Sequence, residues 1–315
     1  MESAIKVNAE REGHKTVLKE SYHSAPYKLT YYGSPTFHEH LEMIIMSASP
    51  GVMDGDILTI DVHAKEKAEL KMFTQSFNKV HPMKEGATQL TTVHVDDDAI
   101  LQYIPHPITP FKDSIFLAKN EIHLQKEGVL IWGDIICSGR VHMKESFVFT
   151  QLHTITKIFR DGKLIFIDNQ FLSPEKQPIQ KMLFFEGYTH QATLLFSSSF
   201  AKDLKLELDE ILAQEYEDIT YGFTQAADDV VIFRALGNNG ELLYDFLLML
   251  GQLCWEFSQH KISEKNQAST EQEKLKNNGN VEITSRNVEN PKEIQSVKAK
   301  KEKVKQIKNK EIILE

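Results

Sequence analysis

The feature that most constrains the fold of this chain is a hydrophobic period of two residues, which extends from about residue 15 to residue 200. Along one segment the apolar side chains at alternate positions are Leu58, Ile60, Val62 and Ala64. An extended strand places such residues on one face, whereas a helix repeats its apolar residues every three or four positions. The sequence therefore predicts a mainly β fold.

Short apolar runs separated by turn residues predict many strands at close spacing. The run Leu41–Ala48 is apolar on much of both faces, which indicates a strand buried between two layers. Further strands are expected at residues 68–77, 89–95, 99–104, 114–117, 120–125, 129–137, 146–159, 164–171 and 190–197. So many short strands indicate a two-layer or coiled β architecture.

Two segments near the C-terminal end change to helical spacing. In residues 207–216, and more strongly in residues 242–257, the apolar residues recur every three or four positions. The second segment carries Cys254 within its apolar stripe, where the thiol serves as a small core side chain. We therefore expect two C-terminal helices, at least one of them docked on a sheet.

Composition divides the chain at about residue 260. The net charge is −9 overall, but residues 261–315 hold 13 Lys and Arg against 9 Asp and Glu, so they carry +4 and residues 1–260 carry −13. The last 55 residues contain no Phe, Tyr or Trp, so burial cannot offset their chain entropy. The sequence predicts a β-rich domain of residues 1–260 and a disordered tail of residues 261–315. The basic run Lys298–Lys310 in this tail is either a solvated segment or a docking arm for an acidic surface.

The same properties restrict the partners and the location of the protein. An acidic body is unsuited to the phosphates of nucleic acid, and the longest apolar stretch is shorter than the roughly 20 residues that span a bilayer. Two cysteines, Cys137 and Cys254, are too few for a disulfide framework, and the N-terminus lacks the pattern of a secretory signal. We expect a cytoplasmic protein that binds neither nucleic acid nor membrane.

Several common catalytic signatures are absent from the sequence. They are the phosphate-binding G-x-x-x-x-G-K-[ST], the zinc-binding H-E-x-x-H, the thiol pair C-x-x-C and the nucleophile elbow G-x-S-x-G. The chain therefore has no nucleotide-binding loop of this kind, and the sequence identifies no catalytic residue.

The densest turn in the sequence covers residues 49–56. Its turn-forming residues are Pro50, Gly51 and Gly55, and the first two are expected to begin a type II turn. Asp54 and Asp56 are separated by one residue, so an extended backbone places both carboxylates on one side, where a divalent cation can bind. The alternative is that both Asp residues only stabilise turns.

Two other clusters contain candidate ligands. Arg140 and Glu145 follow an apolar strand, and either they pair with each other or Arg140 pairs across strands with an Asp of the 49–56 turn. His38 and His40 are two residues apart, which places both imidazoles on one face of a strand, as in some metal sites. Surface histidines without a metal show the same spacing, so both interpretations stay open.

Five motifs follow one another between about residues 17 and 258. They are Ser49–Asp56, Thr74–His81, Leu101–Phe111, Gly139–Phe147 and Phe185–His190. In this order they resemble the urease accessory protein family UreD, called UreH in the Helicobacter lineage, and the last motif resembles the Helicobacter branch in particular. Two features depart from the family pattern: Val52 stands where the family has a second glycine, and the Lys-rich tail has no counterpart.

The resemblance implies a non-enzymatic chaperone for the maturation of urease by nickel insertion, with a β-rich fold of two layers and a pair of helices. Family members bind apo-urease, hold the partner UreF and through it recruit the GTPase UreG, in two-fold complexes. Nickel(II) is then in transit rather than stably bound, and GTP is bound only by the partner GTPase. The resemblance also implies an internal polar path along which nickel passes toward urease.

Our hypothesis from the sequence is that Asp54, Asp56 and Glu145, organised by Arg140, line or gate this path. Carboxylates hold a divalent ion weakly enough to release it, whereas several imidazoles or thiolates would retain nickel. The alternative function is a β-rich protein that binds or hydrolyses a small molecule, with acid and base roles for Asp54 and Glu145.

Overall fold

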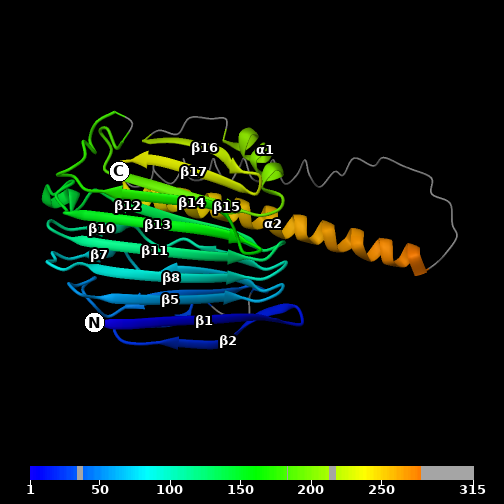
Figure 1. Cartoon of the computed structure of the whole chain (residues 1–315). Coiled ribbons are helices and arrows are strands. Elements are labelled where there is room, and N and C mark those ends of the chain that lie inside the picture. The colour runs from blue at the N-terminus through cyan, green and yellow to red at the C-terminus, as the bar shows by residue number, and fades with distance from the viewer. Residues whose placement is uncertain (34–37, 183, 213–217, 278–315) are drawn as a thin grey trace.

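Two facing sheets and two helices make up the protein in a computed structural model, which describes residues 1–33, 38–182, 184–212 and 218–277 (Figure 1). The seven-stranded sheet, called sheet A here, has the order β14 (Lys163–Leu172), β13 (Gln151–Arg160), β11 (Ile115–Leu124), β8 (Ala87–Val95), β5 (Ile57–Ala64), β1 (Glu2–Glu12), β2 (Lys15–His23). The main path of the 10-stranded sheet, called sheet B, is β16 (Ile219–Ala227), β17 (Val230–Gly237), β15 (His190–Ser197), β12 (Val129–Cys137), β9 (Ile100–Tyr103), β6 (Glu69–Thr74), β4 (Leu41–Ser47), β3 (Tyr27–Tyr31). Its short strands β7 (Asn78–Val80) and β10 (Ile108–Pro110) pair with each other, and β10 also pairs with β12. The expected two-layer β architecture is confirmed.

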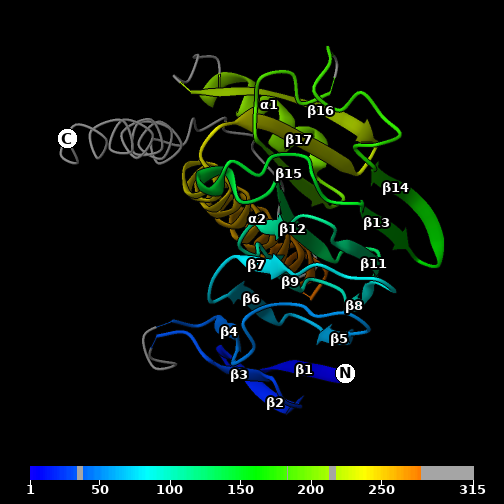
Figure 2. The ribbon, with the colours of Figure 1, turned by 90° about the vertical axis from the view of Figure 1, so that its left-hand side faces the viewer.

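From β4 to β13 the chain passes repeatedly between the sheets and adds parallel strands to each. Strands β5, β8, β11 and β13 are parallel neighbours in sheet A, and β4, β6, β9 and β12 are parallel neighbours in sheet B. Figure 2 shows the resulting coil, with the two sheets as facing layers. In each strand of this coil, alternate side chains point toward the space between the sheets.

The main core lies between the sheets. The alternating residues of β5 that predicted a strand are buried there, together with Leu41, Met43 and Ile45 of β4. A second core lies between the outer face of sheet B and the helices. Each large aliphatic side chain in these cores contributes roughly 1.5–3 kcal/mol. Sheet B is therefore covered on both faces, whereas the outer face of sheet A is not covered by a helix in the described part of the chain (Figure 1).

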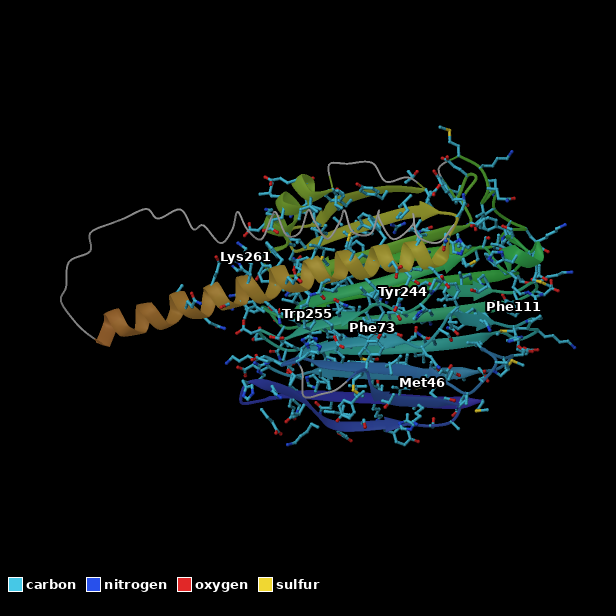
Figure 3. The ribbon with its side chains drawn as sticks, turned by 180° about the vertical axis from the view of Figure 1, so that it is seen from behind. Met46, Phe73, Phe111, Tyr244, Trp255 and Lys261 are labelled. Atoms are coloured by element: carbon cyan, nitrogen blue, oxygen red, sulfur yellow. The ribbon has the colours of Figure 1, made fainter. Side chains whose placement is uncertain are left out.

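Both helices pack on sheet B, as the apolar stripes predict. Helix α1 (Ala201–Ile211) begins earlier than expected because Ala201 and Leu204 extend its buried face toward the N-terminus. Residues 213–216 of the predicted helix lie outside the described residues. Helix α2 spans Gly240–Asn277 and crosses the sheet (Figure 3). The side chain of Asn239 accepts hydrogen bonds from the amides of Glu241 and Leu242, which caps its N-terminus. No described helix has the length and apolar character needed to cross a membrane.

The start of the polar tail differs from the expectation. Residues 261–277, which composition assigns to a disordered tail, continue helix α2. Lys261 forms an ion pair with Asp203 at 3.0 Å, and Lys265 forms one with Asp98 at 2.9 Å, so contacts with the body stabilise helix that composition alone does not favour. Residues 278–315 lie outside the described residues, and their disorder stays a prediction.

Three strands lie outside the range in which the sequence predicted alternation. They are β1, β16 and β17. The inward positions of β1 include Ser3 and Ala9, which are buried but weak signals of hydrophobicity. Strands predicted at 114–117 and 120–125 form the single strand β11.

Candidate functional site

A cavity of about 200 Å³ lies between the two sheets. Sheet B contributes Tyr103, Trp132 and Asp134 to its wall, and sheet A contributes Asn120 and Thr154. The wall is thus partly aromatic and partly polar, which is unusual for the interior of a two-sheet protein. This cavity is the strongest candidate site in the described part of the molecule.

Asp134 is an ionisable group on the cavity wall whose charged form is disfavoured by burial. It lies in β12, where Leu130 and Trp132 occupy the preceding inward positions, so the alternation of the strand turns the carboxylate inward. Burial, and to a lesser extent the charge of Asp168, raise the pKa of Asp134, Arg234 opposes them, and the resulting pKa is about 7. Near neutral pH this carboxyl group can therefore exchange its proton for a cation.

Two polar atoms of cavity-wall residues have no hydrogen-bond partner among the described residues. They are Oδ1 of Asn120 and Oγ1 of Thr154, and both side chains are 5% exposed. A buried oxygen without a partner costs about 1–3 kcal/mol. The wall of the cavity therefore favours an occupant that supplies donors or positive charge to these oxygens, such as water or a hydrated cation.

The loops at one end of the sheets close around the cavity. Ser49, Pro50 and Gly51 lie on its wall with the segment 74–79 and with His106. The ring of His106 stacks on Tyr244 of α2 with the centroids 4.1 Å apart, and burial lowers the pKa of this imidazole. His106 is therefore a neutral nitrogen donor near pH 7.

The turn that contains Asp54 and Asp56 is held by its own carboxylates. Asp54 accepts three backbone hydrogen bonds, at 3.0 Å from Lys84 and at 2.9 Å from both Glu85 and Gly86. Asp56 forms an ion pair with the terminal amine of Met1 at 2.9 Å. Both carboxylates thus stabilise loops, as the alternative interpretation of this turn predicted, and neither is on the cavity wall.

The start of this turn is not the expected type II turn. Gly51 has φ +155°, whereas a type II turn needs about +80° at that position. The reason is tertiary: the amide of Val52 donates to the carbonyl of Lys79 at 2.8 Å, which draws the glycine against that strand. The side chain of Val52 is buried, so the departure from the second family glycine fills a core position.

The remaining candidates from the sequence lie elsewhere. Arg140 pairs with Glu145 through hydrogen bonds of 2.7 and 2.5 Å, which lower the pKa of Glu145, so the direct pair is confirmed over one with Asp54 or Asp56. His38 and His40 stack with ring centroids 4.8 Å apart, and His40 bonds Glu42 at 2.9 Å. Among the described residues no three His, Cys, Asp or Glu side chains are grouped to hold a metal ion.

The three backbone hydrogen bonds of Asp54 lead to a stability prediction. They lower the pKa of Asp54 below its ordinary value of 3.8, so this residue stabilises the fold above that value and loses the effect as the pH falls through its folded pKa. We expect Asp54→Ala to lower the melting temperature at pH 7 by a few degrees, and the difference from the wild type to shrink below pH 4. A difference that is unchanged at low pH would contradict this role.

Comparison with known proteins agrees with the family resemblance. The sequence model of the family described as UreD urease accessory protein matches residues 1–267. The chain belongs to this family. The matched range includes both sheets, the cavity and most of α2, so the family resemblance covers everything that positions the site.

Individual members of the UreD family are similar over nearly their whole length. The urease accessory protein UreD of Acetivibrio thermocellus is 34% identical over 261 residues, which is 81% of this chain and 97% of the relative. UreD of Flavobacterium johnsoniae is 31% identical, over 84% of this chain and 95% of the relative. The urease accessory protein UreH of Helicobacter hepaticus is 30% identical, over 74% and 90%.

Sequence reasoning missed Asp134 as a site residue of this UreD-family chain, although a signal was present. The segment Val129–Cys137 has eight uncharged residues and one aspartate, and an ionisable residue within such a strand is rarely placed there without a partner or a ligand. Asn120 and Thr154 carried no such signal, because polar residues are common in strands with one exposed face.

Proposed function

We propose that this chain is a chaperone for urease maturation that takes part in the insertion of nickel into the urease active site. It acts with UreF and the GTPase UreG and binds apo-urease, in a two-fold heteromeric complex in the cytoplasm. GTP belongs to the partner GTPase, and the chain itself has no catalytic role. Membership of the UreD family supports the role in urease maturation, and the polar cavity supports the part played by nickel.

The cavity around Asp134 is the observation that carries the nickel proposal. It offers a carboxylate, the imidazole of His106 and the neutral oxygens of Asn120 and Thr154. Nickel binds both nitrogen and oxygen donors, and so mixed a set holds the ion less tightly than several imidazoles or thiolates would. We infer that nickel(II) crosses the chain between the sheets and that Asp134 is a temporary ligand on this route.

Asp54, Asp56, Arg140 and Glu145 then have a supporting role in this proposal. The turn of Asp54 and Asp56 continues directly from the cavity-wall residues Pro50 and Gly51, and its carboxylates hold the loops in place. These residues therefore stabilise the loops beside the route and do not bind the ion. Asp54 accepts hydrogen bonds from backbone amides, and Glu145 pairs with Arg140. These separate contacts do not support the alternative, in which the two carboxylates act as an acid and base pair on a small molecule.

Co-purification tests the proposal. The full-length chain, co-expressed with UreF, UreG and the apo-urease subunits, is expected to be retained with all of them on a tagged UreF. A variant that ends at Asn277 keeps all of α2 and is the matched control for residues 278–315. Failure of the full-length chain to bind UreF would refute the assignment, whereas loss of binding only in the shortened chain would give the tail a role.

A further inference from the structure

A groove of about 470 Å³ lies where the two sheets end on one side of the molecule. Strand β14 is the last strand of sheet A and β16 is the last strand of sheet B, and no described strand pairs with the outer edge of either. Both strands line the groove, and Figure 2 shows them on the same side of the molecule. Their outer edges leave backbone amides and carbonyls available to a further strand. We call this feature the edge groove.

The edge groove is lined by apolar side chains from the core and by exposed aromatic side chains. Leu172, Phe185 and Leu236 line it from the core side, where they belong to one hydrophobic cluster or pack against it. Phe171 and Phe184 also line it and are 38% and 42% exposed. Exposed aromatic side chains beside two open strand edges indicate a site that binds an extended apolar segment.

Gly222 of β16 keeps the edge groove open. Its register partner is Arg234 of β17, and Arg234 reaches Asp168 of sheet A at 2.6 Å, so both register positions face the space between the sheets. A Cβ atom at Gly222 would have no atom within 4 Å. A larger side chain at this position would therefore fill part of the groove without a clash.

The sequence beyond α2 contains one segment suited to such a groove. Between residues 278 and 315 the apolar residues stand singly except for Ile312, Ile313 and Leu314, which are consecutive. Isoleucine favours the extended conformation, and in a strand Ile312 and Leu314 point to the same face. This segment can therefore offer two apolar side chains to a groove and its backbone to a strand edge.

Chain length and charge allow this segment to reach the edge groove of its own molecule. Leu236 of the groove lies just before α2, and this helix of 38 residues carries the chain about 57 Å away. Residues 278–311 span up to about 110 Å when extended, which is enough to return. Within them Lys298–Lys310 holds seven Lys and one Glu, whereas residues 1–260 carry −13. Repulsion among the lysines extends this run, and the acidic body attracts it.

We propose that residues 312–314 bind in the edge groove as an extended segment, so that the basic tail forms a strap across the acidic body of the same molecule. Ile312 and Leu314 pack against Phe171 and Phe184, and the backbone of the segment bonds an open strand edge. The strap thereby protects an edge that would otherwise be free to pair with other chains. This proposal does not depend on the function proposed above.

Hydrogen exchange of the full-length chain, measured by mass spectrometry, tests the strap. We expect the double variant Ile312→Asp with Leu314→Asp to exchange the amides of β14 and β16 on the order of tenfold faster than the wild type, because the strand edges are then open to water. The matched control is Ile283→Asp with Val288→Asp, which makes the same change of charge at isolated apolar residues of the tail. We expect this control to exchange these amides at the rate of the wild type.

Gly222→Val tests the strap from the side of the groove. Valine is favourable in a strand, fills part of the groove and leaves the tail sequence unchanged, so the amides of residues 312–314 are expected to exchange faster. Equal exchange of β14 and β16 in the wild type and in the Ile312 and Leu314 double variant would overturn the proposal. Equal acceleration in the Ile283 and Val288 control would also overturn it.

The dependence on protein concentration separates a strap within one molecule from binding between two copies. Protection of β14 and β16 is expected to be the same at low and high concentration. Protection that appears only at high concentration would overturn the strap, since the segment would then bind a second copy. None of these measurements involves partner proteins, so failure here leaves the co-purification test of the proposed function unaffected.

Discussion

Urease matured with an Asp134→Ala variant is expected to contain on the order of tenfold less nickel than urease matured with the wild type. The substitution removes the carboxylate that faces the cavity and leaves the outer surface of the protein unchanged. Binding of UreF, UreG and apo-urease should therefore be preserved. The measurement is the nickel content of purified urease after maturation with equal amounts of each variant, together with urease activity.

Asp54→Ala is the matched control for this experiment, because it removes a carboxylate from the loop beside the cavity but not from its wall. At a temperature where both variants are folded, Asp54→Ala is expected to support nearly normal nickel content. Normal nickel content with Asp134→Ala would refute a route past this residue. Equal losses in both variants would also refute it, since they would indicate a requirement for folding rather than for a ligand.

Asp134→Asn tests separately whether the residue stabilises the fold. The pKa of Asp134 is raised from an ordinary value of 3.8 to about 7, so the folded state binds a proton that the unfolded state releases between these values. The stability of the wild type therefore falls as the pH rises through this range and levels off above it. We expect Asp134→Asn to be more stable than the wild type by roughly 2–4 kcal/mol at pH 8, and by little at pH 4. Denaturant unfolding at the two pH values measures the difference.

The Gly51→Ala variant is expected to lose roughly 2–4 kcal/mol of stability, which corresponds to about 5–10 °C in melting temperature. A Cβ atom at Gly51 would overlap the carbonyl oxygen of Lys79 and lie 2.9 Å from Cδ2 of His81. The φ of +155° is also unfavourable for other residues. Alanine therefore pushes the loop away from the strand and weakens the hydrogen bond from Val52 to Lys79.

Gly55→Ala is the matched control for Gly51→Ala, because both glycines lie in one turn. Gly55 also has a positive φ, of +75°, but a Cβ there would have no atom within 4 Å. Its cost is the backbone strain alone, roughly 1 kcal/mol. The melting temperatures of the two variants compare the stability lost through a close contact at Gly51 with the stability lost through backbone strain alone at Gly55. A smaller effect at Gly51 than at Gly55 would contradict the packing argument.

The fold class could be predicted from the sequence because its cause is local. The alternation in β5 and the apolar run of β4 determine which residues face inward, whatever the partners of each strand are. The stripe on residues 242–257 likewise determines the buried face of α2. Strand β1 and the extension of α2 beyond Lys261 were missed, because they depend on weakly apolar positions and on ion pairs with the body.

The candidate site was predicted less well, because it depends on which strands come together. The sequence by itself determined the resemblance to the family, through the order of five motifs, and the presence of a dense turn at residues 49–56. Only the tertiary structure placed Asp134, Asn120 and Thr154 on one cavity, although they lie on three strands and in two sheets. It also showed that Asp54 and Asp56 are engaged with backbone amides and the N-terminus. Inward direction is a local property of a strand, whereas the distance between two inward side chains is set by strand order and sheet packing, which no local pattern encodes.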